Sequence, residues 1–68
     1  MIHIKLAVKL AEKKWTQAEL ARRTGIRPNT ISDLYNEVAT AITFYNLEQI
    51  CITLQCNIED LLYIEKNK

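Results

Sequence analysis

The chain's only glycine and only proline, Gly25 and Pro28, lie three positions apart, between two segments that both have the sequence pattern of a helix. Before them, residues 16–19 have the sequence of a capping box, in which the Thr16 hydroxyl accepts from the backbone N–H of Glu19 and the Glu19 carboxylate reaches back. Gly25 suits the left-handed residue that ends a helix, and Pro28 suits the first position of the next one. We therefore predict two short helices, about 16–25 and 28–36, joined by a tight turn.

The length of 68 residues allows one small domain, 1–68, and leaves no room for a two-domain enzyme. With 49% hydrophobic and 25% charged residues, the composition is typical of a compact, mostly helical protein. No apolar run approaches the roughly 20 residues that a membrane-spanning helix needs, and no signal-peptide pattern opens the chain. We expect a cytoplasmic protein with no membrane partner.

The residues before Thr16 predict a strand-like start followed by a helix. Ile2 and Ile4 alternate with polar residues, which is the period of a strand. A helix is then expected from about residue 6 to residue 13, with Leu6 and Leu10 on its inward stripe. Its start lacks a good capping residue, so this boundary is the least defined.

The residues after Asn36 predict a connector and two more helices. The connector spans 37–42, and Thr43 then caps a helix whose apolar positions follow helical spacing: Phe44, Leu47, Ile50, Cys51 and Leu54. Residues 57–60 resemble a second capping box. The short helix that it starts is expected to bury Ile58, Leu61 and Leu62.

The residues that most often carry chemistry are few in this sequence. Cys51 and Cys56 lie in an apolar periodic stretch, which favours two reduced, buried thiols over a disulfide or redox pair. A zinc site needs about four ligands at tight spacing, and the one histidine, His3, lies at the far end of the chain. We expect His3 to be solvated, and we expect no metal, cofactor, small-molecule substrate or enzymatic activity.

The charges are unevenly distributed, although the chain carries a net charge of only +1. Residues 1–30 sum to +5 and residues 31–68 to −4. A basic half favours an anionic partner, and an acidic half stays away from that partner. Ordinary solvated helix faces explain the same charges about equally well.

The two central helices match a helix-turn-helix arrangement, in which the second helix projects from a compact support into the DNA major groove. The pattern consists of small and aliphatic residues around the glycine turn: Leu20, Ala21, Gly25, Ile26, Ile31 and Leu34. The major groove is about 12 Å wide and admits one helix, so short polar side chains on that helix can reach base edges. Asn29, Thr30, Ser32 and Asp33 suit that role.

The segment from Thr16 to Asn36, together with Asn57 to Leu62, resembles the Cro-type, phage-repressor-like (XRE-type) helix-turn-helix family of bacterial and phage regulators. The similarity covers nearly the whole chain. The resemblance implies an all-α, five-helix DNA-binding domain that binds an operator and regulates transcription, usually as a dimer on a pseudo-palindrome. In small members like this one it also implies a two-stranded pair of chain ends, here residues 2–5 and 63–66.

The resemblance also implies roles for individual residues. Thr16 and Gln17 match positions that grip phosphate, and Pro28, Asn29, Ser32 and Asp33 match positions that face bases. Two departures matter: Pro28 replaces a frequent polar reader, and residues 37–40 (Glu-Val-Ala-Thr) replace a loop that often carries lysines. The first removes one base contact and leaves more of the discrimination to Asn29, and the second weakens the expected grip on the DNA backbone.

Several residues keep two interpretations. Asn29 either reads a base or stabilises the start of its helix. Arg22, Arg23 and Arg27 either contact phosphate or are solvated charges. Tyr35 and Asn36 are further candidates for backbone contact. The aromatic side chains are expected to pack in the core or at its edge rather than stack on bases: Trp15, Tyr35, Phe44, Tyr45 and Tyr63.

Two interpretations also remain for the end of the chain and for the function as a whole. Ile58, Leu62, Tyr63 and Ile64 belong either to the core or to a contact with a twin subunit.

The leading function is a sequence-specific repressor that binds a double-stranded DNA operator as a homodimer. The alternative is a protein-interaction module on the same scaffold, an antitoxin or antirepressor whose acidic half binds a protein.

Overall fold

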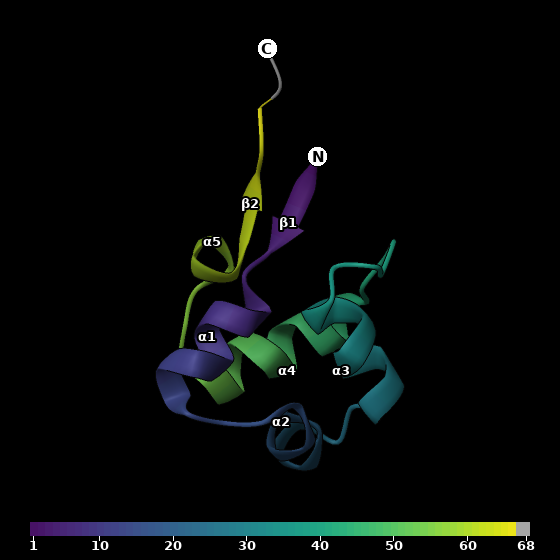
Figure 1. Ribbon diagram of the computed structural model, residues 1–68, viewed down its shortest axis with the longest axis vertical. Coiled ribbons are helices and arrows are strands. Elements are labelled where there is room, and N and C mark those ends of the chain that lie inside the picture. Colours follow the sequence, from purple (N-terminus) through teal and green to yellow (C-terminus); the bar gives the residue numbers. More distant parts are fainter. Residues whose placement is uncertain (67–68) are drawn as a thin grey trace.

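The computed structural model describes residues 1–66, which form a bundle of short helices with a two-stranded ribbon projecting from one end (Figure 1). The elements, in chain order, are β1 (Ile2–Ile4), α1 (Leu6–Lys13), α2 (Gln17–Thr24), α3 (Pro28–Tyr35), α4 (Phe44–Leu54), α5 (Ile58–Leu61) and β2 (Leu62–Ile64). The predicted five helices and terminal strand pair are confirmed. No helix within residues 1–66 is long and apolar enough to cross a membrane.

One apolar core holds the helices together, because each helix contributes at least one buried side chain to it. The side chains with essentially no exposure are Leu6, Leu10, Leu20, Ile31, Ile50 and Leu61. Trp15 and Tyr35 pack against the edge of this core, as predicted. Cys51 is buried and Cys56 half-buried, and both thiols are free.

The predicted caps define most of the helix boundaries. The Thr16 Oγ1 accepts from Glu19 N at 3.1 Å, and the Thr43 Oγ1 accepts from Asn46 N at 3.0 Å. At the start of α5, the Asp60 carboxylate accepts from Asn57 N at 3.1 Å. The Glu19 carboxylate does not complete the expected box, because it bonds Arg22 and Arg23 instead.

The two strands of the terminal ribbon have other bounds than predicted. β1 and β2 are antiparallel with Ile2 opposite Ile64 and Ile4 opposite Leu62, so β2 starts one residue earlier than expected and both strands are shorter. Leu62 is therefore half-buried in a strand and does not belong to α5. A hydrogen bond from Lys5 N to Leu61 O, at 2.7 Å, extends the strand pairing to the end of α5. The chain therefore continues from Leu61 as a strand and not as a helix.

Four side chains expected to pack in the core or at its edge are exposed. Phe44 is 89% exposed and Tyr45 is also exposed, because they begin α4 beyond the point where its buried residues meet the core. Ile58 is 55% exposed, since the one-turn helix α5 buries only Leu61. Tyr63 is exposed on the ribbon, where it stacks on His3 and not on the core. The prediction that these four residues pack against the core was wrong.

Candidate nucleic-acid interface

The turn between α2 and α3, residues 25–27, fixes one helix against the other through local hydrogen bonds. Gly25 has φ +75°, the left-handed conformation, and its N–H donates to Ala21 O at 2.8 Å. The Thr24 hydroxyl donates to Leu20 O at 2.8 Å and accepts from Ile26 N at 3.2 Å. Buried Ile26 then anchors the turn in the core. Because these backbone groups are paired locally, α3 leaves the turn in a defined direction.

Helix α3 has one buried and one exposed side. Pro28 occupies its first turn, and Ile31 and Leu34 are buried against the rest of the domain. Residues four apart lie on one face of a helix, so the side opposite this pair carries Asn29 and Asp33. The structure places the five predicted base-reading residues as follows: Pro28, Asn29 and Asp33 are exposed, and Thr30 and Ser32 are half-buried.

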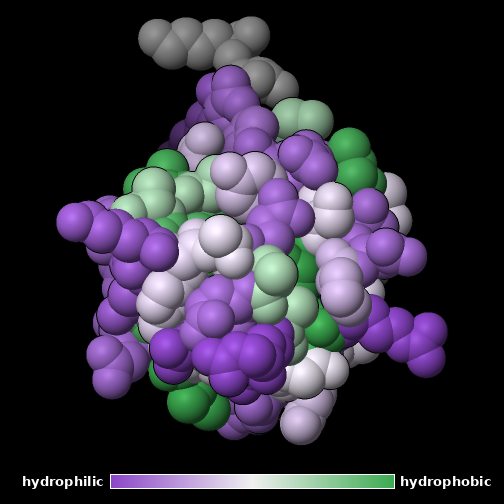
Figure 2. All heavy atoms as spheres, turned by 60° about the horizontal axis from the view of Figure 1, so that its bottom comes forward, coloured by the Kyte–Doolittle hydropathy of each residue, from purple (hydrophilic) through white to green (hydrophobic). Residues whose placement is uncertain are grey.

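The face turned forward in Figure 2 is the α2 end of the bundle; hydrophilic side chains gather below its centre and project from both flanks, with paler and apolar side chains between them. At the start of α2, Thr16 is exposed and Gln17 half-buried. The first N–H groups of a helix lack intrahelical partners, and the helix dipole favours an anion there. This end of α2 is therefore suited to a phosphate group.

The arginines of α2 are positioned by neighbours. Arg22 Nη2 lies 2.5 Å and Arg23 Nε 2.6 Å from Glu19 Oε2, and the Arg23 guanidinium also lies over the Trp15 ring, 4.3 Å from its centroid. These two hydrogen-bonded guanidinium groups, Arg22 first, lower the pKa of the Glu19 carboxyl. Glu19 offsets part of the positive charge of these two arginines. Arg27 lies apart from them, as the exposed residue directly before α3.

The end of α3 is tied to the terminal ribbon. Asn36 caps α3 and its Nδ2 donates to Ser32 Oγ at 3.3 Å, while Tyr35 is half-buried beside it. The next residue, Glu37, has φ +59°, and its carboxylate accepts from His3 Nδ1 at 2.9 Å and from Ile4 N at 3.3 Å. Glu37 therefore faces the ribbon through this contact.

His3 is not the freely solvated residue that the sequence predicted. Its Nε2 lies 2.5 Å from Glu65 Oε1 and its Nδ1 lies 2.9 Å from Glu37 Oε1, and only a protonated ring can donate to both carboxylates. The ring also stacks on Tyr63, with centroids 5.1 Å apart. Hydrogen bonds to Glu37 and then Glu65 raise the pKa of His3. Sequence reasoning missed this cluster because its two carboxylates lie 34 and 62 positions from His3, and no local pattern links them.

The four candidates for twin-subunit contact do not share one surface. Leu62 and Ile64 lie on one side of the ribbon with Ile2 and Ile4, whereas Tyr63 lies on the other side with His3. Ile58 is on α5, beside the outer face of α4.

Comparisons with known proteins agree with this architecture. The sequence profile of the Cro/C1-type HTH DNA-binding domain family matches residues 5–67. The HTH-type transcriptional regulator YozG of Bacillus subtilis (strain 168), itself uncharacterized, is 41% identical over 61 residues, which cover 90% of this chain and 73% of YozG. A crystal structure of a Bacteroides fragilis protein provisionally assigned as DNA-binding superposes with a TM-score of 0.81 at 27% identity, over 93% of this chain and all of that one.

Proposed function

Because the chain belongs to the Cro/C1-type helix-turn-helix DNA-binding family and is a DNA-binding transcriptional regulator, we propose that it reads a specific operator with the exposed side of α3. One observation carries this proposal: α3 buries Ile31 and Leu34 and leaves Asn29 and Asp33 on the surface. A helix supported in this way can enter a major groove with polar side chains directed at base edges.

Each surface residue has a distinct proposed contact. Asn29 is the principal base reader, since its amide can form two hydrogen bonds with adenine. Asp33 accepts from a cytosine amino group only where no phosphate approaches it. Pro28, Thr30 and Ser32 complete the base-facing set through shape and single contacts.

The proposed phosphate contacts surround this set. Thr16 and Gln17 bind phosphate at the start of α2, and Arg22, Arg23 and Arg27 supply positive charge nearby. Tyr35 and Asn36 contact the backbone at the far end of α3. Such contacts position the protein without reading sequence, and they make affinity fall with salt.

One copy of α3 covers too few bases for tight specificity, so we propose a symmetric homodimer on half-sites about one DNA turn apart. The apolar strip that Leu62 and Ile64 form with exposed Ile2 is the proposed contact surface. Occlusion of a promoter by this dimer is the simplest regulatory outcome, which makes the protein a repressor. Ile64→Asp is expected to shift the sedimenting species from dimer to monomer.

Selection of bound sequences from a random DNA pool tests the function directly. The purified chain is expected to enrich a motif with two related half-sites. Fluorescence anisotropy on the enriched duplex and on a scrambled duplex, at several salt concentrations, then separates specific from non-specific binding. No enrichment, or equal affinity for both duplexes at every salt concentration, would contradict the proposal.

A further inference from the structure

The outer face of α4 exposes three large apolar or aromatic side chains, Phe44, Tyr45 and Ile52, beside one charged residue, Glu48. Glu48 is the only charged residue between Phe44 and Leu54, and Ile52 on the outer face is 63% exposed. A surface helix ordinarily carries charged or polar residues on the side away from the core. Contiguous exposed apolar side chains of this kind mark surfaces that another molecule covers.

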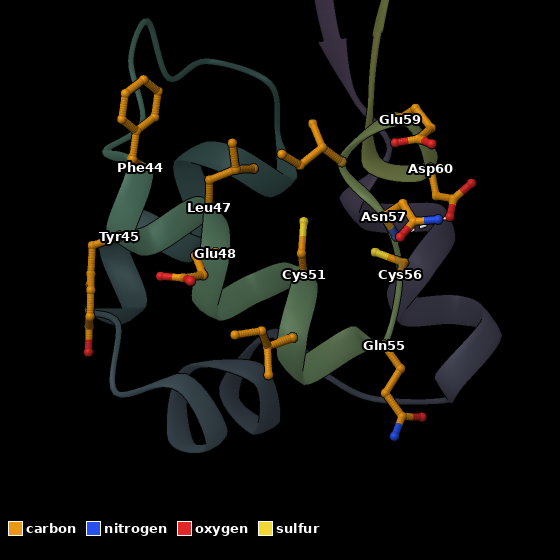
Figure 3. A pocket seen from close by; sticks show the side chains of 12 residues that line it. Phe44, Tyr45, Leu47, Glu48, Cys51, Gln55, Cys56, Asn57, Glu59 and Asp60 are labelled. Atoms are coloured by element: carbon orange, nitrogen blue, oxygen red, sulfur yellow. Dashed lines mark hydrogen bonds between the residues drawn. The ribbon is translucent and has the colours of Figure 1, made fainter.

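This face forms one wall of an open groove whose other wall is α5 (Figure 3). The groove has a volume of about 1130 Å³. Phe44 and Tyr45 extend from the start of α4 at one end, and Cys51 and Cys56 lie between α4 and the segment leading into α5. Exposed Ile58 adds an apolar side chain to the α5 wall.

The rim of the groove is acidic. Glu48 lies on the α4 side and Glu59 and Asp60 on the α5 side, and no Lys, Arg or His of residues 1–66 lines the groove. This negative charge favours an occupant that carries cations beside its apolar side chains. A second copy docked groove to groove across a twofold axis brings these same carboxylates together, which disfavours it.

We propose that the α4–α5 groove binds a basic amphipathic helix of a partner protein. Apolar side chains of that helix, spaced i, i+3 or i+4 and i+7, occupy the groove, and Lys or Arg side chains beside them face Glu48, Glu59 and Asp60. The eleven residues of α4 span about 16 Å, which matches a helix of three turns. Because the groove shares no residue with the proposed DNA surface, the partner and the operator can bind the same molecule.

A synthetic three-turn peptide with Leu on one face and Lys on the other is the first probe, and the same peptide with Glu in place of Lys is its control. Titrated into the ¹⁵N-labelled chain, the Lys peptide is expected to shift the amide resonances of Phe44, Ile52 and Ile58 in a saturable way. The Glu peptide is expected to bind at least about tenfold more weakly. Equal binding of the two peptides, or shifts centred elsewhere, would overturn the proposal.

Ile52→Ser and Val8→Ser form a matched pair of variants, because Val8 is 53% exposed on α1 and lies outside the groove. Each replaces an exposed aliphatic side chain without adding a charge that would itself attract the Lys peptide. Ile52→Ser is expected to weaken binding of the Lys peptide at least about tenfold, while Val8→Ser changes it less than about twofold. Circular dichroism melting verifies that both variants are folded.

Operator affinity of Ile52→Ser is expected to equal that of the unaltered chain. Undiminished peptide binding by Ile52→Ser would overturn the proposal. Sedimentation as a dimer that this substitution dissociates would also overturn it, because a second copy then occupies the groove.

Discussion

Substitution of Gly25 offers a clean test of the turn that sets α3 against α2. Gly25 has φ +75°, and a Cβ added there would meet no atom within 4 Å. Gly25→Ala therefore introduces no collision, and its whole cost arises from holding an L-residue in the left-handed conformation. That conformation costs about 1–2 kcal/mol per residue. Alanine also restricts the unfolded backbone, which offsets about 0.5–1 kcal/mol of this cost, so we expect the free energy of unfolding to fall by about 0.5–1 kcal/mol.

In a domain of 60–100 residues, 1 kcal/mol corresponds to a change of about 4–8 °C in Tm. Gly25→Ala is therefore expected to lower Tm by roughly 2–8 °C, and Gly25→Asn by less, since Asn tolerates this conformation better. Thermal melts and urea unfolding followed by circular dichroism measure both variants. An unchanged m-value would show that the surface exposed on unfolding is the same.

Gln55 allows the opposite substitution. It ends α4 at φ +56°, so a residue other than glycine already holds the left-handed conformation there. Gln55→Gly relieves the left-handed conformation but frees the unfolded backbone, so a net gain of about 0.5–1 kcal/mol is expected. A Gly25→Ala loss above about 3 kcal/mol would reveal a steric clash that the structure does not contain. An unchanged free energy of unfolding in Gly25→Ala, or equal losses in Gly25→Ala and Gln55→Gly, would show that the left-handed conformation does not determine these changes.

Three further predictions address the core, the phosphate contacts and the ribbon. Leu34→Ala should lower the free energy of unfolding by about 2–5 kcal/mol in urea titrations, because Leu34 is 4% exposed; a loss below about 1 kcal/mol would contradict its place in the core. Arg23→Ala should reduce the slope of log affinity against log salt by about one on any DNA, and an unchanged slope would mean that Arg23 only neutralises its carboxylate neighbour. Hydrogen bonds to Glu37 and Glu65 raise the pKa of His3 above 6.5, so their stabilising contribution is present below pH 6.5 and is lost as pH rises through the folded-state pKa. NMR titration of the imidazole should give a midpoint above 6.5 that returns toward 6.5 in Glu37→Gln. A midpoint at or below 6.5 in the unaltered chain would contradict the hydrogen bonds of His3 to Glu37 and Glu65.

The helix-turn-helix could be predicted from the sequence because its determinants are local. Thr16 caps α2, Gly25 ends it and Pro28 begins α3, and each residue acts through backbone within a few positions of itself. The spacing of Ile31 and Leu34 then identifies the buried side of α3. The polar side follows by exclusion, which is why the proposed base-facing residues could be named from the sequence.

The remaining features depend on contacts between distant residues. Nothing near His3 indicates that it meets Glu37 and Glu65, since that meeting requires the ribbon register and the left-handed turn at Glu37. Helical spacing likewise does not indicate that Phe44 lies beyond the core. The spacing identifies which face of α4 is apolar, but it does not show how far the neighbouring helices extend along that face. Leu62 was wrongly assigned to the last helix, because an apolar residue that follows one helical turn fits the start of a strand equally well.

The affinity of Asn29→Ala for the selected operator and for a scrambled duplex, measured at the same salt concentration, tests most directly whether the exposed side of α3 reads bases. We predict a loss of about 1–3 kcal/mol on the operator and little change on the scrambled duplex. Melting of the variant verifies that α3 is intact. Equal losses on both duplexes, or none on the operator, would contradict the account.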